Sequence, residues 1–576
     1  MSGGRPQWLS YNRPFGTIVP QTLEDASEMI GTSRALAPAF ALMLLVPGAA
    51  RAQEATTPPP ERPTLELSLD ESVKRALENN VDIAVERYNP ELSEEAIRLY
   101  RGSYDPLLIS TVSQNSRTSP ATNAFAGATE VVNKTTTYNF GAEQLLKTGG
   151  NLRVDFSNNR GSTNSVFSSF NPIFNASLNA NLSQPFLRNF KIDNNRLQLK
   201  VARKNREISD VQFQQTVTNT VAGVKDLYYD LLYAIDNLEA QRKSLSLAQK
   251  LLDENQIKVK VGTMAPLDVV AAQSEVASRE EGVIVAEAAV AEAEDAIKSA
   301  IFPKNDPTVW ALRIVPTDRP TAEPMLVDVE DATRKALDHR TDVVAARKNL
   351  ENADVNVQYA SNQKLPDLNL IAAYGSSGIG GTVIQREGFG GPVIATFPGG
   401  YNDALSSVFG RDFPTWTFGV NFSYPIFNRQ GQAASARAKI SRDQTVASLR
   451  RLEMQVASEV RSAGRAVETN YKRVESTRAA RVLQERRLDA EQKKFAAGMS
   501  TNFMVTQAQR DLALAEVLEL RAIADYRKSL VNFERVQMAG GGVAFASTAV
   551  SRAASGGAAT PTNVNTGSGA GPTPNP

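Results

Sequence analysis

The sequence contains one segment twice, and this duplication limits the possible fold more than any other feature. Ungapped matches align the two copies in the same order, at offsets that fall from about 260 to about 236 residues. The matched pairs include Ala76 with Ala336, Pro106 with Pro366, Asn181 with Asn421, and Gly262 with Gly498. Because the offset decreases along the chain, the first copy has extra residues in its middle. We therefore expect two related repeats, over residues 67–326 and 327–538.

Each copy predicts a helix, then strands, then a very long helix that a tight turn joins to a shorter helix. The predicted helices cover residues 70–102, 194–261 and 266–301 in the first copy, and 329–360, 431–497 and 502–536 in the second. In each copy the two shorter helices together match the long one in length. Stacked end to end beside it, they would form a rod of roughly 100 Å. An ordinary cytosolic helical array is disfavoured, because its helices have similar, modest lengths.

The first long helix carries an apolar residue at every seventh position. The series is Leu231, Leu238, Leu245, Leu252 and Val259, with Ala234, Gln241, Ala248 and Asn255 between its members. A seven-residue apolar period predicts helices that supercoil around their neighbours. The small residues in the series allow those neighbours to approach closely.

The predicted strands alternate strictly between apolar and small polar residues. Between Trp416 and Tyr424 every second residue is apolar, while the residues between them are Thr, Gly, Asn and Ser. Residues 177–183 show the same alternation, and Leu368, Leu370, Ala372 and Tyr374 form another apolar face. A transmembrane strand needs about 9–11 residues with one apolar face. A soluble sheet over a core is the alternative, but the small polar faces and an export signal favour strands in a membrane, with Trp416 and Tyr424 at its interfaces.

The first copy has two further candidate strands, residues 136–146 and 151–159, joined by a turn at Thr148-Gly149-Gly150. The second copy has a glycine-rich stretch at 375–412 instead, which is expected to form a loop outside the cell. Whether the extra hairpin joins a barrel or lies in a loop stays open at this point.

Both ends of the sequence differ from its body. Arg34, the apolar run 35–46 and the small residues around Arg51 indicate an export signal, with translation starting at Met29 and cleavage after Ala52. Residues 1–52 are therefore expected to be absent from the mature protein. Residues 53–66 predict a proline-rich linker, and 539–576 a disordered tail of low complexity. The run 35–46 is too short to span a membrane as a helix, and no other run approaches 18 apolar residues.

Composition argues against several classes of function. The chain has no cysteine, and its one histidine, His339, lies between charged residues on a predicted helix. Thiol chemistry, disulfides and Cys/His zinc sites are thereby excluded, and nothing indicates a catalytic site, a metal or a cofactor. The 63 basic and 62 acidic residues nearly cancel, so no basic field predicts nucleic-acid binding.

With its duplication and strand pattern, the chain resembles the TolC family of outer-membrane efflux proteins. The resemblance covers about residues 67–536. It rests on the motifs 69–73 and 76–80, on Ser183-Gln184-Pro185-Phe186-Leu187, and on the turn segments 261–269 and 497–512.

The resemblance implies a mainly α fold with transmembrane β-strands: a homotrimer with one shared outer-membrane β-barrel and a tunnel of long periplasmic coiled helices. Twelve strands are implied, a number that the extra hairpin could raise. The expected role is a channel for efflux or type I secretion from a Gram-negative bacterium, embedded in outer-membrane lipid. Its expected partners are a periplasmic adaptor (membrane fusion protein) and an inner-membrane transporter. The alternative is a periplasmic coiled-coil adaptor or scaffold protein.

The resemblance also assigns roles to residues of the two interhelical turns. The adaptor-contacting residues are expected to be Val261, Gly262, Thr263, Leu267, Asp268, Gly498, Ser500 and Thr501. The candidates for the pore constriction are Asp268, Met504 and Gln507. Met504 and Gln507 stand where relatives carry acidic residues, and Ser500 stands where the basic partner of Asp268 is expected. A gate closed by that ion pair is therefore not expected here.

Overall fold

The computed structural model describes residues 63–121, 129–303, 307–319, 322–388 and 390–541. All of them belong to one compact unit, residues 62–576. The expected export signal, residues 53–62 of the linker and residues 542–576 of the tail lie outside the described residues. Among the helices that are described, none is both long and apolar enough to cross a membrane.

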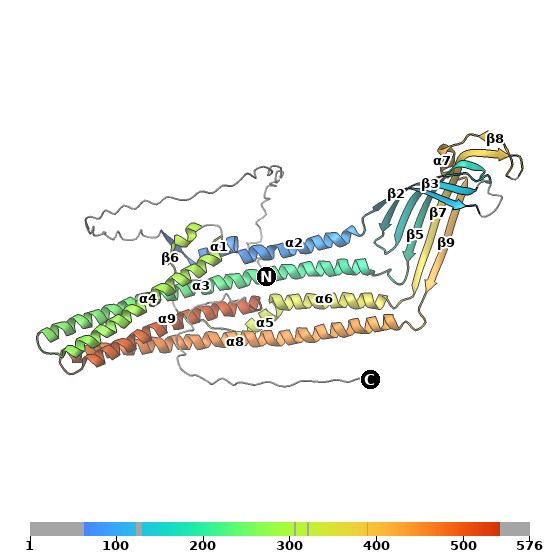
Figure 1. The fold of residues 1–576 in the computed structure, drawn as a ribbon. Helices are drawn as coiled ribbons and strands as arrows, with labels where there is room; N and C mark the ends of the chain where they lie inside the picture. The colour runs from blue at the N-terminus through green and yellow to red at the C-terminus, as the bar shows by residue number, and fades with distance from the viewer. Residues whose placement is uncertain (1–62, 122–128, 304–306, 320–321, 389, 542–576) are drawn as a thin grey trace, which may run out of the picture. The chain divides into compact units, whose positions relative to one another are not determined.

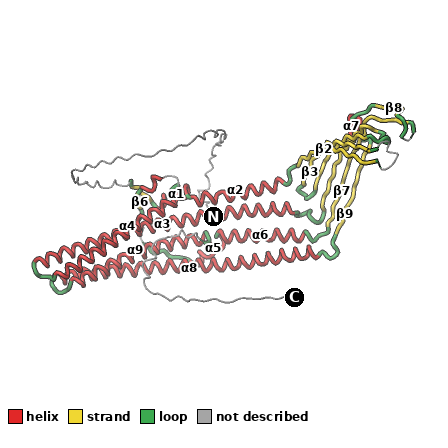
Figure 2. Tube along the Cα trace, in the orientation of Figure 1, coloured by secondary structure: helices red, strands yellow, loops and turns green. Residues whose placement is uncertain are grey.

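Both halves of this unit contain helices, then strands, then a long helix and a shorter helix (Figures 1 and 2). The first half contains β1 (Thr64–Leu67), α1 (Leu69–Asn79), α2 (Val81–Gly102), β2 (Leu107–Pro120), β3 (Glu130–Leu145), β4 (Asn151–Thr163), β5 (Phe170–Pro185), α3 (Asn194–Lys260), α4 (Pro266–Ile301), a 3-10 helix (Pro307–Ala311) and β6 (Arg313–Pro316). The second contains α5 (Val329–His339), α6 (Thr341–Asn362), β7 (Asp367–Arg386), β8 (Val393–Phe397), α7 (Tyr401–Gly410), β9 (Phe413–Ser423), α8 (Arg429–Ala496) and α9 (Asn502–Met538).

The first helix of each half is broken, so the prediction of one continuous helix there is wrong. Asn80 interrupts the first because its side-chain oxygen accepts from Asp82 N at 2.9 Å and caps α2. A short amide side chain that bonds to nearby backbone competes with helix formation in this way. Arg340 stands at the corresponding break between α5 and α6.

Both break residues also reach the end of a helix that is distant in sequence. Asn80 Nδ2 donates to the carbonyl of Ala300 in α4 at 3.1 Å, and Arg340 Nη1 donates to that of Val536 in α9 at 3.3 Å. Figure 1 shows the result: α4 and α2 follow one another along α3, and α9 and α6 along α8. The expected end-to-end stacking is present, but it leaves out α1 and α5, which turn aside.

Each half has its own apolar core at this level. In the first, Leu67 of β1 and Ile314 of β6 pack with Tyr228 and Leu231 of α3. The two strands pair in parallel, and the Tyr228 hydroxyl donates to the Leu67 carbonyl at 3.2 Å. Residues 64–66 are therefore strand and not linker, because pairing with β6 buries this end of the segment. The second core joins α5, α8 and α9.

Only some members of the seven-residue series of α3 are buried against neighbouring helices. Leu231 is fully buried, but nearer the turn Leu245 and Leu252 are half-buried, while Ser244 and Leu251 are buried instead. Near the turn, α3 therefore buries a different side from the one that the series marks. Leu251 there packs with Val505 and Leu512 of α9.

The strands form one antiparallel sheet in the order β2-β3-β4-β5-β7-β9, with β8 paired to the outer end of β7. The extra hairpin of the first half, β3–β4, lies inside this order. Except across a bulge between Phe170 and Ile173, even-numbered residues oppose even-numbered residues in every pair of these six strands. Directly opposed residues share a face of the sheet. We call the two faces the even face and the odd face.

The glycine-rich stretch expected to be a loop is largely strand and helix. β7 continues through it to Arg386, and α7 packs Ala404 and Val408 on Ala176 of the even face. A Cβ on Gly378 would collide with the carbonyl of Ala404. The glycines here let helix and sheet approach closely, and so do not indicate a loop.

The C-terminal boundary of the folded part lies slightly beyond the expected residue 538. Ala539 is fully buried, and the carbonyl of Gly540 accepts a hydrogen bond from Gln215 of α3 at 3.0 Å. The predicted tail therefore begins after these contacts.

One acidic side chain in the α3–α9 contact lacks a matching partner among the described residues. Asp226 Oδ1 is buried without a hydrogen bond. Burial raises the pKa of Asp226 from 3.8 to about 6, an effect that Lys528 opposes and Asp230 reinforces. Between those pH values the folded chain holds more protons than the unfolded chain, so stability falls as pH rises through this window. The cost at neutral pH is about 3 kcal/mol.

We predict that Asp226→Asn raises the Tm at pH 7.5 by roughly 2–5 °C. The gain should shrink towards pH 4, where the wild-type carboxyl is protonated. Scanning calorimetry at several pH values measures the difference. The matched control is Asp230→Asn on the same helix, which removes a 2.7 Å ion pair with Lys528 and should give no gain. A gain for Asp226→Asn that is equal at pH 4 and pH 7.5 would contradict the prediction.

Candidate functional site

The two interhelical turns that the sequence singles out lie at the same end of the helices (Figure 1). Asn255 of α3 donates to the side-chain oxygen of Asn502 in α9 at 2.8 Å, and both side chains are buried. Asn502 in turn donates to the backbone carbonyl of Asp268 in α4 at 3.4 Å. These contacts bring together predicted site residues from both repeats. We call residues 257–270 and 495–507 the tip.

Each turn closes its long helix with the same glycine-dependent motif. After α3, Thr263 N donates to Lys258 O at 2.9 Å and Gly262 N to Val259 O at 3.0 Å. After α8, Met499 N donates to Lys494 O at 2.8 Å and Gly498 N to Phe495 O at 3.1 Å. This is the Schellman pattern, which needs a left-handed residue at the glycine position. The φ angles of Gly262 and Gly498 are 79° and 75°.

An apolar cluster and a charged cluster hold the tip helices together. The apolar cluster consists of Leu251, Leu488, Val505, Ala508 and Leu512. The charged one joins α4 to α9, where Arg510 and Arg279 both contact the buried Glu275. Burial by itself raises the pKa of Glu275, but the hydrogen bonds from Arg510 and Arg279 outweigh burial and hold this pKa below its ordinary value. These contacts hold the helices of the tip in place, and with them the residues at its surface.

The surface of the tip is apolar and exposed. Four side chains are about three-quarters exposed: Val261 (71%), Leu267 (76%), Met499 (74%) and Phe503 (68%). Exposed apolar groups gathered beside polar ones are typical of protein interaction sites. The sequence analysis identified Val261 and Leu267 as residues of the contact surface but did not identify Met499 and Phe503. Met499 lies in the second turn and Phe503 directly after it, and this position could have indicated both.

The other predicted tip residues have mostly local contacts. Ser500 donates to Glu491 at 2.8 Å, and Gln507 donates to Asp511, which also pairs with Arg487. Among the described residues, no ion pair of Asp268 is found. Met504 is partly exposed. The structure thus places Asp268 beside Asn502, and Met504 and Gln507 farther along α9.

The opposite end of the chain's helices leads into the sheet, whose two faces differ in polarity. One complete row of the even face is Leu108, Ala142, Val154, Ala180, Tyr374 and Trp416. The neighbouring row of the odd face is Leu107, Glu143, Arg153, Asn181, Ala373 and Thr417. This row of the even face is thus apolar from edge to edge, while that of the odd face is largely polar.

The even face has the dimensions of a lipid-facing band. Trp416 and Tyr424 are eight residues apart, about 27 Å along the strand. A lipid-facing band is about 25 Å tall and flanked by aromatic residues. Arg153 lies on the odd face, 3.5 Å from Asp155. An arginine on the lipid face would cost about 2–4 kcal/mol at the bilayer midplane. In the rows near the helices, only the even face is suited to lipid.

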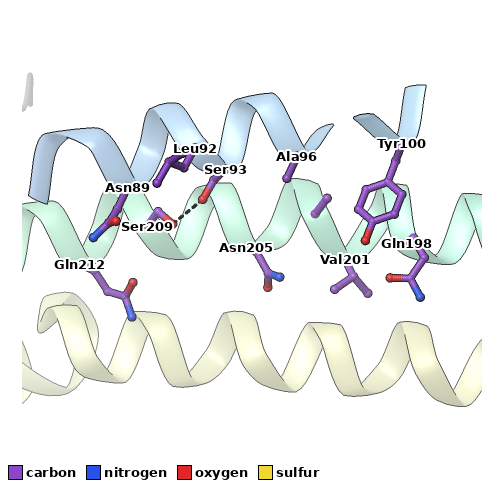
Figure 3. Close-up of a pocket in the computed structure, with 11 residues that line it drawn as sticks. Asn89, Leu92, Ser93, Ala96, Tyr100, Gln198, Val201, Asn205, Ser209 and Gln212 are labelled. Atoms are coloured by element: carbon purple, nitrogen blue, oxygen red, sulfur yellow. Dashed lines mark hydrogen bonds between the residues drawn. The ribbon is translucent and has the colours of Figure 1, made fainter. Parts of the chain in front are cut away.

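A groove lies between α2 and α3 (Figure 3). Its lining residues are Asn89, Leu92, Ser93, Ala96, Tyr100, Gln198, Val201, Ala202, Asn205, Ser209 and Gln212. Ser93 and Ser209 share a hydrogen bond of 2.8 Å. None of the lining residues is charged, so the groove offers no acid–base pair. Among the residues that the structure describes, no cluster of His, Cys, Asp and Glu could hold a metal ion.

Comparisons with known proteins agree with this architecture. A family model described as "Outer membrane efflux protein" matches residues 72–301 and 332–536. The "Outer membrane protein TolC" of Vibrio cholerae is 22% identical over 340 residues, which cover 58% of this chain and 72% of that protein.

Solved structures show the same fold at low sequence identity. A membrane protein from Pseudomonas aeruginosa has a TM-score of 0.59 and 17% identity, covering 82% of this chain and 90% of its own. The CmeC outer membrane channel of Campylobacter jejuni has a TM-score of 0.56 and 16% identity, covering 81% and 85%. The MtrE outer membrane channel of Neisseria gonorrhoeae has a TM-score of 0.55 and 15% identity, covering 81% and 88%.

We predict that Gly498→Val opens the second turn of the tip. No atom lies within 4 Å of a Cβ built on Gly498, so the cost is that of the backbone alone. A left-handed conformation costs a non-glycine residue about 1–2 kcal/mol, and asparagine less. Hydrogen exchange at the Met499 amide should therefore accelerate roughly tenfold in Gly498→Val. Gly498→Asn is the control and should change exchange much less. Equal rates in the two variants would show that backbone strain does not govern this turn.

Proposed function

The chain belongs to the outer membrane efflux protein family and is an outer-membrane protein of a Gram-negative bacterium, and from this premise we propose that three copies form one channel. Their sheets join into a shared β-barrel, and their helices form a periplasmic tunnel. Cargo passes through the pore passively, in efflux or type I secretion, while an inner-membrane transporter supplies the energy. The family is one of channels, so no catalytic activity is proposed.

The observation that carries this proposal is the sheet with an apolar even face and two open edges. β2 pairs only with β3, and β9 only with β7, among the described strands. Unpaired backbone groups are not tolerated in lipid, so a sheet in the membrane must close. β2 leads away from the helices and β9 returns to them, so β9 of one copy can pair antiparallel with β2 of the next. Three such contacts close the ring.

The helices support the same arrangement. α2, α3, α6 and α8 form a row in which each packs against the next. Its two outer members expose apolar side chains along their length: Leu92 and Leu99 on α2, and Ile440 and Met454 on α8. Burial of such groups between neighbouring copies would stabilise the tunnel. The alternative of a coiled-coil adaptor is disfavoured, because the family that matches both repeats is one of channels.

The tip is proposed to contact a periplasmic adaptor. Its residues Val261, Gly262, Thr263, Leu267, Asp268, Gly498, Ser500 and Thr501 combine an exposed apolar surface with two rigid turns. Met499 and Phe503 extend this surface. Asp268, Met504 and Gln507 remain the candidates for the constriction, and Trp416 and Tyr424 the candidates for the membrane interfaces.

The first test is the mass of the chain extracted gently from outer membranes and measured by light scattering corrected for detergent. We expect about three times the mass of the mature protomer, and single-channel conductance in planar bilayers. A soluble periplasmic monomer would refute the shared barrel.

The tip assignment predicts that Val261→Asp combined with Leu267→Asp weakens adaptor binding by at least about tenfold, since charges would replace exposed apolar contacts. Surface plasmon resonance with a purified adaptor of the host measures the affinity. The control is the oligomeric mass of the variant, which should stay that of the wild type because both side chains point into solvent. Unchanged affinity with unchanged mass would place the adaptor contact elsewhere.

A further inference from the structure

We infer that the β3–β4 hairpin of the first repeat is part of the barrel wall, so that each copy contributes six strands and the trimer eighteen, three times six. This inference rests on the proposed shared barrel and concerns its size. A family-like count would be twelve, with the hairpin outside the wall. The difference decides how wide the outer end of the channel is.

The ladder runs through the hairpin in a single register, although the β3–β4 pairing has a gap between Thr137 and Phe140. β3 pairs with β2 from Glu130 to Glu143, and β4 pairs with β5 from Asn151 to Gly161. β2 and β5 are therefore separated by two full strands. Closing the sheet without the hairpin would require β2 and β5 to leave both ladders and to pair with each other.

The hairpin also shows the same division of faces as the other strands. Phe140 and Ala142 of β3 and Val154 and Phe156 of β4 lie on the even face, in the rows that hold Leu178 and Ala180 of β5. Near the helix end of the hairpin, the charged residues Glu143, Arg153 and Asp155 lie on the odd face, where Arg153 approaches the other two. Glu130, Lys134 and Arg160 lie on the even face, but nearer the outer end of the sheet. A hairpin in an aqueous loop has no need of a continuous apolar face. The division indicates lipid on one side and a water-filled lumen on the other.

The position of the hairpin turn provides a third, independent argument. The turn at Thr148 and Gly149 lies at the helix end of the sheet, where Thr148 Oγ1 and Gln184 Oε1 are 2.6 Å apart. The amide of Gln184 donates to the Thr148 carbonyl at 3.1 Å, and a Cβ on Gly149 would collide with the carbonyl of Asn189. Gln184 is the last residue but one of β5, and Asn189 belongs to the segment that links β5 to α3. The hairpin therefore crosses the whole height of the sheet, whereas a hairpin in an outer loop would turn at the other end.

The consequence is a wide outer pore. Barrel diameter grows roughly in proportion to strand number, so eighteen strands give about 1.5 times the diameter of twelve. Barrels of about 16–18 strands leave an open aqueous channel. The barrel then admits cargo of larger cross-section than a twelve-stranded wall, and selection by size is left to the tip. The hairpin further adds Glu143, Arg153 and Asp155 from each copy to the lumen wall.

The absence of cysteine from the chain allows a direct test of which environment the hairpin faces. Single cysteines are placed at Val154→Cys in the hairpin and at Ala180→Cys in β5, which lie opposite one another on the even face. Each is labelled with a bimane fluorophore, and the full-length channel is reconstituted into phosphatidylcholine vesicles with brominated acyl chains. A second pair, Ser157→Cys and Asn179→Cys, reports on the odd face through reaction with a membrane-impermeant thiosulfonate. Ala142→Cys replaces Val154→Cys if that variant does not assemble.

We expect the bimane at position 154 to be quenched by the brominated lipid to within about twofold of that at position 180, because a barrel strand presents one face to lipid. The impermeant reagent should reach positions 157 and 179 alike. Quenching at 180 without quenching at 154 would overturn the inference while leaving the shared barrel intact. Absence of quenching at both positions would refute the membrane sheet itself, and the inference with it.

Discussion

A β-strand in lipid must pair the backbone groups of both its edges, because the bilayer offers no other hydrogen-bond partner. Four strands of this chain meet that requirement internally, whereas β2 and β9 each leave one edge open among the described residues. In the proposed barrel, the folded chain therefore needs neighbouring copies to close its sheet, although its helices have packed cores of their own. The open edges continue into α2 and α8, and both of these helices expose apolar side chains. One requirement of the backbone thus accounts for the shape of both the sheet and the helical row.

The helical part depends on two junctions between broken helices. At the second, the guanidinium of Arg340 is almost wholly buried between Glu459 at 2.6 Å and Asp342 at 3.0 Å. A buried charge is tolerated only when it is paired and fully hydrogen-bonded, and the carbonyl of Val536 completes the set. Asn80 achieves the same connection in the first half with a neutral amide. The two repeats therefore keep one geometry with different chemistry, which is how a duplicated sequence can diverge without losing its architecture.

The two ends of the unit have different physical character. At the tip, buried asparagines and glycine turns fix a small apolar surface in place, which suits recognition of another protein. At the sheet, a broad apolar face is backed by a polar one, which suits a wall between lipid and water. Additional strands in each copy add circumference without changing the helices, because strands are about 4.8 Å apart and lengthen the ring independently. Pore width and partner recognition can therefore change separately in this fold.

The sequence by itself determined the duplication, the extents of α3, α4, α8 and α9, and the alternation that separates the two faces of the sheet, because apolar period and turn glycines are local signals. It also indicated Val261, Leu267 and both glycines of the tip. The break at Asn80 has a local cause, the side-chain cap on α2. The break at Arg340, the burial of Ala539 and the strand character of residues 375–386 instead involve partners more than a hundred residues away, such as Val536, Asn219 and Ala176. No local pattern specifies such contacts. The place of the β3–β4 hairpin was undecided for the same reason: alternation gives a strand its two faces, but only register with its neighbours decides which sheet it joins.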